Sequence, residues 1–296
     1  MTWLLLAFLA AICTSLTTIF AKIGIRKVNS NFATMYRTGI VILCSIVVCL
    51  ISDSFKEVKN LTLNNYLFLG ISGIMTGLSW LCYYRAIKLG DVNKVAPIDK
   101  SSFILTSILL LIFFFGETTN NGNPLTIVML FVSMSLMFFG TLLMISKQET
   151  DGVVDKKWLI YAILSTVFAA LVNLFVKIGL KGTSHDLGTL FRAIIVFIFA
   201  IAIVIVRKDY KGASSIDKKS YLFLTLSGIA TGGAWLFENA AISNGVAVVV
   251  NSIGKLSILL TMLLSFLILK EKFTKKSLLG LTLLTLGIIV IVVFSL

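Results

Sequence analysis

The sequence predicts an all-α polytopic membrane protein with ten transmembrane helices, which form two inverted five-helix repeats. Three observations carry this prediction: the composition, the number of long apolar stretches and an internal duplication. Of the 296 residues, 58% are hydrophobic and only 13% are charged, and the mean hydropathy is +1.01. Soluble domains carry about a quarter charged residues. A chain this apolar therefore belongs mainly in hydrocarbon.

Ten stretches are long and apolar enough to cross a membrane, which requires about 20 residues in a helix. The segments between them are polar, and Pro124 suits the first turn of the fifth helix. The N-terminal stretch lacks a basic region before it and is too long for a signal peptide, so we expect it to be retained as a membrane helix. The expected spans are 2–23, 33–51, 64–85, 93–115, 124–145, 157–179, 187–206, 220–242, 246–269 and 277–295.

An internal repeat relates the two halves of the chain at an offset of 155 residues. Between Tyr66–Thr106 and Tyr221–Thr261, 20 of 41 aligned positions are identical. The offset also pairs Arg37 with Arg192, which shared hydrophobicity does not explain, because charged residues inside spans are costly. Five spans per half is an odd number, so the second half enters the membrane from the opposite side. We predict repeats at 1–146 and 147–296, an arrangement common among secondary transporters.

The distribution of basic residues predicts the orientation in the membrane. Loops after odd-numbered spans carry sixteen lysines and arginines, whereas the other loops carry three, Lys56, Lys59 and Lys181. The positive-inside rule places the odd loops, including 207–219, in the cytoplasm and both termini outside. The same rule accounts for the net charge of +13, so we expect no nucleic-acid partner.

The chain resembles the drug/metabolite transporter superfamily, specifically its EamA-type carriers with two EamA domains. The resemblance rests on the ten spans, on the duplicated SGIMTGLSWLCYYRAIKLGDVNKVAPIDKSSFILT and SGIATGGAWLFENAAISNGVAVVVNSIGKLSILLT, and on Gly116-Glu117 and Lys270-Glu271. It implies a secondary transporter of the cell membrane that moves a small metabolite by alternating access. Family members handle amino acids, amines, sugars, nucleotide derivatives and drugs, and several are exporters, so we expect an exporter.

Ionisable residues within spans or at their ends are the candidate site residues, because such groups must face a partner or a watered cavity. Long side chains near a helix end can instead extend to the membrane surface. Both readings remain open for the basic residues nearest the helix ends, which are Lys22, Arg37, Lys177 and Arg192.

Lys100 and Lys255 are stronger candidates, since each lies about 10–13 Å along its span at 1.5 Å per residue. Pro97 and Gly254 interrupt the same two spans, and such interruptions at corresponding positions indicate a transporter's binding region. We expect both lysines to line one central cavity. Asp99 adjoins Lys100 but cannot face it along a helix, so we expect it to pair with Lys22 or Arg37.

Glu238 lies in span 8, where the other repeat has Tyr83. A carboxyl in low dielectric can bind a proton near neutral pH, which makes a proton a candidate coupling ion. The alternative is a structural ion pair with Lys255 or Lys177. The nearby aromatic side chains could hold a substrate or pack between helices; these are Trp80, Trp235 and Tyr84. The spacings Gly73-xxx-Gly77 and Gly228-xxx-Gly232 predict close helix packing.

The expected partners are a small-molecule substrate and the lipid bilayer, and the sequence makes no prediction of oligomeric state. In-span charge comprises seven basic residues against two acidic ones, which favours an anionic or zwitterionic substrate such as an amino acid. The alternatives are an amine or cationic drug held by Glu238, or a lipid-linked substrate moved by a flippase of the same fold. We expect no enzyme, cofactor or metal, because the sequence lacks an HExxH motif or paired catalytic acids.

Overall fold

The computed structural model describes residues 2–25, 28–89, 98–99, 101–143, 157–210, 216–269 and 275–295, and the regular structure within these ranges is helical. The first half contains α1 (Thr2–Gly24), α2 (Ser30–Ile51), the short 3₁₀ helix η2 (Ser54–Asn60), α3 (Leu63–Leu89), α5 (Ser102–Phe113), α6 (Phe115–Thr118) and α7 (Pro124–Leu143). The second half contains α8 (Lys157–Gly179), α9 (His185–Arg207), α10 (Lys218–Asn244), α11 (Ala247–Gly254), α12 (Leu256–Leu269) and α13 (Lys275–Ser295).

The helices bear out the prediction of an all-helical polytopic membrane protein. Within the described ranges, eight helical stretches are long and apolar enough to cross a membrane, and two shorter apolar helices, Ser102–Phe113 and Leu278–Phe294, accompany them. The expected span 93–115 is represented by α5 alone, because residues 90–97 and 100 lie outside the described part. The expected repeat boundary at 146–147 also falls outside it, within 144–156.

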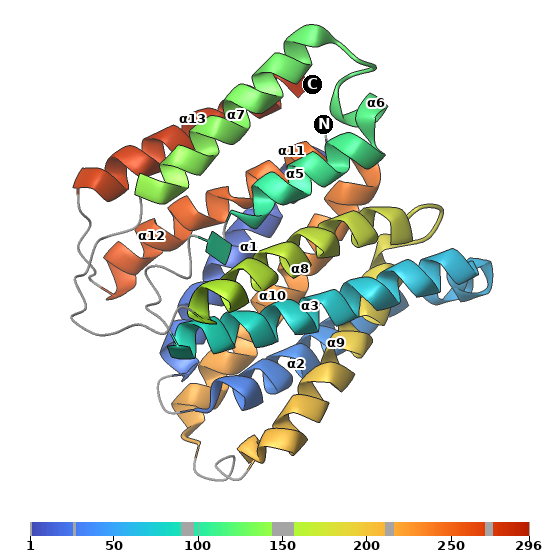
Figure 1. The fold of residues 1–296 in the computed structure, drawn as a ribbon. Helices are drawn as coiled ribbons and strands as arrows, with labels where there is room; N and C mark the ends of the chain where they lie inside the picture. Colours follow the sequence, from blue (N-terminus) through green and yellow to red (C-terminus); the bar gives the residue numbers. More distant parts are fainter. Residues whose placement is uncertain are drawn as a thin grey trace.

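Helices that the repeat relates make equivalent contacts. In Figure 1, α1 packs along α10, and its repeat mate α8 packs along α3 in the same way. Side chains follow the same symmetry. The ring centroids of Phe20 and Phe223 lie 6.1 Å apart, and those of their repeat mates Phe175 and Phe68 lie 6.0 Å apart. The sequence repeat is therefore matched by a repeat in packing.

Glycines allow the central helices to approach closely, as their spacing predicts. A Cβ atom at Gly73 would lie 2.8 Å from the Ile195 side chain, and one at Gly228 would lie 2.7 Å from Ile40. The backbone oxygens of Arg192 and Arg37, respectively, are the next nearest groups, at 3.3 and 3.1 Å. Because these contacts too are repeat mates, both glycines set the distance between α3 and α9 and between α10 and α2.

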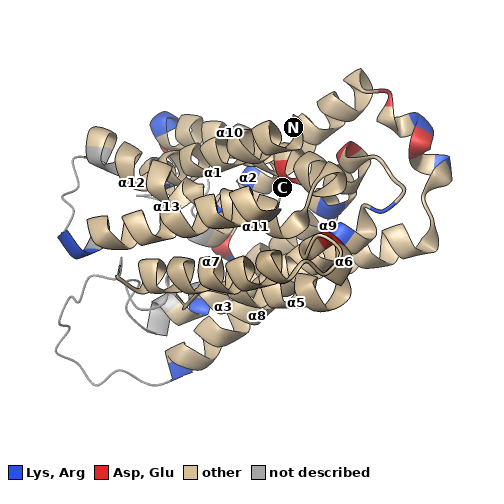
Figure 2. Cartoon of the chain, turned by 90° about the horizontal axis from the view of Figure 1, so that it is seen from above, with Lys and Arg blue, Asp and Glu red and all other residues tan. Residues whose placement is uncertain are grey.

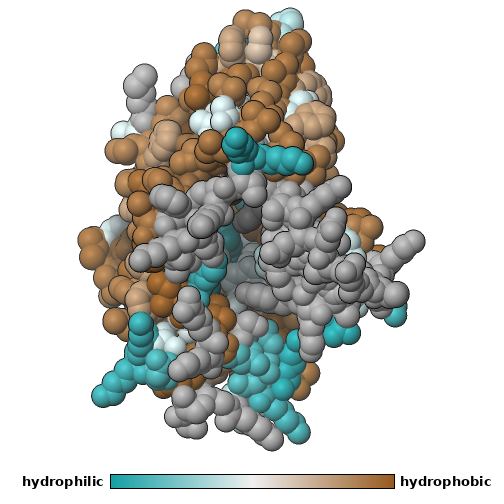
Figure 3. Space-filling view, turned by 90° about the vertical axis from the view of Figure 1, so that its left-hand side faces the viewer, coloured by the Kyte–Doolittle hydropathy of each residue, from teal (hydrophilic) through white to brown (hydrophobic). Residues whose placement is uncertain are grey.

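The charged groups gather at the two ends of the bundle. Both termini lie at one end, and Figure 2 shows acidic and basic residues mixed there, whereas Lys and Arg predominate at the other end among the described residues. Figure 3 looks onto this basic end, where hydrophilic side chains are exposed and hydrophobic side chains cover the flanks. The apolar flanks match the hydrocarbon belt expected of a membrane protein.

Candidate functional site

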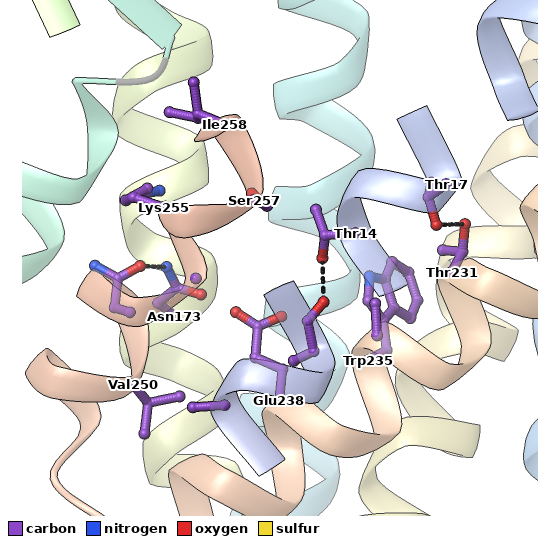
Figure 4. A pocket seen from close by; sticks show the side chains of 15 residues that line it. Thr14, Thr17, Asn173, Thr231, Trp235, Glu238, Val250, Lys255, Ser257 and Ile258 are labelled. Atoms are coloured by element: carbon purple, nitrogen blue, oxygen red, sulfur yellow. Dashed lines mark hydrogen bonds between the residues drawn. The ribbon is translucent and has the colours of Figure 1, made fainter. Parts of the chain in front are cut away.

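A polar cavity of about 220 Å³, here called the first chamber, lies between α1, α8, α10, α11 and α12. Figure 4 shows its side chains converging from these separate helices. In the middle of an apolar bundle, such a group of polar side chains is the feature expected of a solute-binding site. The polar residues lining it are Thr14, Thr17, Asn173, Thr231, Glu238, Asn251, Lys255 and Ser257.

The helix that contributes Asn251 and Lys255 is interrupted at the cavity. The α11 helix ends at Gly254, Lys255 lies in the turn between the two helices, and α12 begins at Leu256. The Lys255 N–H bonds the carbonyl of Ser252 at 3.0 Å instead of continuing the regular helical pattern. A Cβ at Gly254 would meet nothing within 4 Å, so the wall is open at this position. The interruption that Gly254 predicts is present, and it places Lys255 in the wall.

Two amides, a half-buried one at Asn173 and a buried one at Asn251, form a second polar feature of the first chamber. Asn173 of α8 donates from Nδ2 to Oδ1 of Asn251 on α11, at 3.2 Å. The Asn251 side chain is 5% exposed, and its own Nδ2 has no hydrogen-bond partner. A buried donor without an acceptor is costly. A ligand with an acceptor oxygen would satisfy it.

Glu238 and Lys255 bring opposite charges to the same cavity from different helices. Glu238 lies on α10 and Lys255 at the break between α11 and α12, and both line the first chamber in Figure 4. The Lys255 ammonium also lies 5.9 Å from the ring centroid of Phe103, on α5. The chamber thus has an acidic group, Glu238, on one helix, and hydrogen-bond donors, the Lys255 ammonium and the Asn251 amide, on another.

A second chamber of about 120 Å³ adjoins the first and shares two of its residues, Thr231 and Trp235. It lies between α2, α3 and α10. Its charged lining residue is Arg37, which donates from Nη2 to the hydroxyl of Thr231 at 2.9 Å. Trp80 completes the wall opposite its repeat mate Trp235. Together the two chambers reach the lower end of the size range of small-molecule pockets, about 300 Å³.

Arg192, the repeat mate of Arg37, lies beside the wall of these chambers. Its guanidinium carbon is 4.2 Å from the centroid of the Trp235 ring, and the residue is 6% exposed. Arg192 is therefore a buried cation stacked on a cavity-lining tryptophan, not a side chain that extends to the membrane surface.

Two of the predicted residues lie away from the chambers. Lys177 forms an ion pair with Glu117 of α6 at 2.9 Å and donates to the carbonyls of Ile242 and Gly245 at 2.9 and 3.1 Å. Pairing of Lys177 with Glu238 is therefore wrong, because the end of α10 and the carboxylate of Glu117 occupy its ammonium. Lys22 is exposed in the last turn of α1.

Asp99 lies on the α8 side of the bundle, where its carboxylate accepts a hydrogen bond from Ser165 at 2.7 Å. Ser165 in turn contacts Ser79 of α3, at 3.3 Å between the hydroxyl oxygens. Lys100 lies outside the described residues, as does the side chain of Tyr84. The prediction that Lys100 shares a cavity with Lys255 thus stays a prediction.

Sequence reasoning missed six polar lining residues, Thr14, Thr17, Asn173, Thr231, Asn251 and Ser257. The internal repeat contains a signal for some of them. Asn251 corresponds to Ala96 and Thr17 to Val172, just as Glu238 corresponds to Tyr83. At these positions the two halves differ in polarity, so such differences mark part of the cavity lining.

The fold and the cavity define the class: a multi-pass α-helical membrane protein with a polar cavity enclosed by repeat-related helices and one broken helix. The chain belongs to the EamA-like transporter family, whose profile matches residues 1–139 and 156–293. This membership confirms the resemblance to EamA carriers.

Comparison with individual proteins agrees with this family. Over 107 residues, which are 36% of the chain and 75% of the relative, it is 43% identical to a protein of Sinorhizobium sp described as an uncharacterized transporter in the cobO 3′ region. A crystal structure with 14% sequence identity shares the fold, with a TM-score of 0.78 over 99% of this chain and 97% of the other.

Proposed function

We propose that the chain is a secondary transporter that carries a small zwitterionic, amino-acid-like metabolite across the cell membrane by alternating access. The observation that carries this proposal is the first chamber, where Glu238 faces the same space as Lys255 and the unsatisfied Asn251 amide. A substrate ammonium would bind Glu238, while its carboxylate would accept hydrogen bonds from Lys255 and Asn251. Charge-assisted hydrogen bonds of this kind are the stronger ones in proteins.

The repeat architecture supports alternating access. In carriers built from inverted repeats, the site lies at the repeat interface near discontinuous helices. The first chamber meets this description, because α1 comes from one repeat, α8, α10, α11 and α12 come from the other, and α11–α12 is broken at Lys255. Export is the direction we propose, as in several carriers of this family. Glu238 is the group that would bind the substrate ammonium and the coupling proton in alternation.

An apolar groove of about 660 Å³ between α5, α7 and α8 bears on the flippase alternative. Lipid-like cargo would require a lateral path from such a groove into the polar cavity. The groove is lined chiefly by Ile, Leu, Phe and Met side chains and shares no described residue with either chamber. We therefore favour a soluble substrate.

A thermal-shift experiment on the purified protein tests the proposal, since a ligand that binds only the folded state raises the melting temperature. The probes are L-alanine, propionate and propylamine, which carry both charged groups, the carboxylate alone or the ammonium alone. L-alanine should stabilise the wild type most, and Glu238→Gln and Lys255→Ala should each reduce that shift. Arg85→Gln, at an exposed arginine of α3, is the control.

The amine alternative predicts a different pattern. Stabilisation by propylamine and choline alone, lost in Glu238→Gln, would contradict the zwitterion proposal and identify a cation carrier. Uptake of labelled L-alanine into proteoliposomes then separates transport of a soluble solute from lipid flipping.

A further inference from the structure

We propose that the second chamber is an anionic subsite, which binds a carboxylate or phosphate on the substrate's side chain while the first chamber holds its amino-acid group. The preferred substrate would then be an acidic zwitterion. This inference rests on the proposed function, because it concerns only the part of the substrate that would extend past Thr231 and Trp235 into the second chamber.

The shape of the cavity supports two subsites instead of one. The chambers share Thr231 and Trp235, which lie one helical turn apart on α10, so a ligand can contact both chambers across this turn. Thr231 is fixed there by three contacts: it donates to the Ser227 carbonyl at 2.7 Å, accepts from Arg37 at 2.9 Å and lies 3.2 Å from the Thr17 hydroxyl. The boundary between the chambers is thus well ordered.

The charges divide between the chambers in a way that favours an anion in the second. Glu238 and Lys255 both line the first chamber, whereas the described lining of the second chamber contains Arg37 and no acid. Arg192, stacked on Trp235, places a second guanidinium, which is buried, beside the shared wall. The electrostatic potential around the second chamber is consequently more positive than that around the first.

The chemistry of Arg37 matches carboxylate and phosphate groups. A guanidinium is a planar fork of N–H donors that binds either group through two parallel hydrogen bonds. An uncharged side chain of the substrate could pack on Trp80 and Trp235, but it would displace water from the Arg37 guanidinium without replacing the hydrogen bonds that the water made. Hence an anionic group in the second chamber gains more binding free energy than an apolar group of similar size.

Ligand pairs that differ only in the distal group test the subsite. Dissociation constants from thermal-shift titration would be compared for L-glutamate against L-glutamine and for O-phospho-L-serine against L-serine. The acidic member of at least one pair should bind the wild type about tenfold more tightly or better, as expected for a charged hydrogen-bonded pair. Arg37→Gln should abolish that preference, while Arg85→Gln should keep it.

The outcomes separate the subsite from the proposed function. Equal affinity within both pairs in the wild type would overturn the anionic subsite, yet leave the zwitterion proposal standing. Failure of all four amino acids to bind would contradict the proposed function itself. The pair that shows the preference identifies carboxylate or phosphate. Arg37→Lys, which keeps the charge but loses the fork, should retain only part of the preference, and it replaces Arg37→Gln if that variant does not fold.

Discussion

At the scale of single residues, part of the polarity of the first chamber comes from positions where the two repeats differ. Asn251 replaces the alanine of the first repeat, and Glu238 replaces a tyrosine. By contrast, Thr231 and Trp235, which form the boundary between the chambers, are identical to their mates Thr76 and Trp80. Shared residues thus form the boundary between the chambers, whereas the first chamber takes its binding groups from two unshared residues, Glu238 and Asn251, and from Lys255, whose mate is Lys100.

Asn251 provides a direct test of this division. Asn251→Leu preserves the approximate volume but removes the amide donor, so the KM for the transported amino acid should rise about tenfold or more, since a hydrogen bond to a charged group contributes about 1.5–3 kcal/mol. Uptake kinetics in proteoliposomes measure the change. The matched control is Asn244→Leu, at an exposed residue near the end of α10. A KM within twofold of wild type in Asn251→Leu would remove Asn251 from the binding site.

At the scale of helices, the central contacts depend on glycine. A Cβ at Gly228 would lie 2.7 Å from Ile40 and 3.1 Å from the Arg37 carbonyl oxygen, so α10 and α2 cannot keep their present distance with a larger residue. The neighbouring Arg37 lines the second chamber. The packing that holds the two repeats together is therefore also the packing that positions a cavity residue.

Gly228→Ala and Gly73→Ala should each destabilise the protein by about 1–3 kcal/mol, the usual cost of overpacking a close contact. Gly39→Ala is the control, because its Cβ would meet Phe197 at an ordinary 3.5 Å, and alanine is the better helix former by about 1 kcal/mol. Melting temperatures in detergent measure both effects. Unchanged melting temperatures for Gly228→Ala and Gly73→Ala would show that the helices separate without cost.

At the scale of the whole molecule, the two ends of the bundle differ in charge and in their contacts. Most of the loop lysines and arginines that the structure describes lie at the basic end, whereas α6, whose Glu117 pairs with Lys177, lies at the end with the termini. Lys177, on α8, donates to the carbonyls of Ile242 and Gly245 at the end of α10. Glu117, on α6, accepts a hydrogen bond from the N–H of Ala247, the first residue of α11, at 3.3 Å. The ion pair therefore connects four helices at that end.

The charge difference predicts that the termini lie outside and that the basic end faces the cytoplasm. In a background without Cys13, Cys44, Cys49 and Cys82, cysteines would replace the exposed residues Asn60 and Lys219 one at a time. A membrane-impermeant maleimide applied to intact cells should label Asn60→Cys and leave Lys219→Cys unlabelled until the cells are permeabilised. The reverse pattern would show that the orientation is inverted.

The sequence by itself determined the membrane class, the helical fold, the repeat and the family resemblance, because each is written in local patterns. Apolar length identifies a span without knowledge of its neighbours. Likewise, the identity between Tyr66–Thr106 and Tyr221–Thr261 requires no coordinates. Gly254 also predicted the helix break at Lys255, since interruptions of this kind are visible in one segment alone.

Only the tertiary structure decided which polar groups meet. Lys177 and Arg192 look alike in sequence as basic residues within a few turns of a helix end, yet Lys177 binds Glu117 while Arg192 stacks on Trp235. Similarly, Asn173 and Asn251 are ordinary amides until α8 and α11 bring them to 3.2 Å. The physical reason is that the cost of a buried polar group depends on the partners supplied by other helices, and these partners are set by how the helices pack, both within a repeat and between repeats.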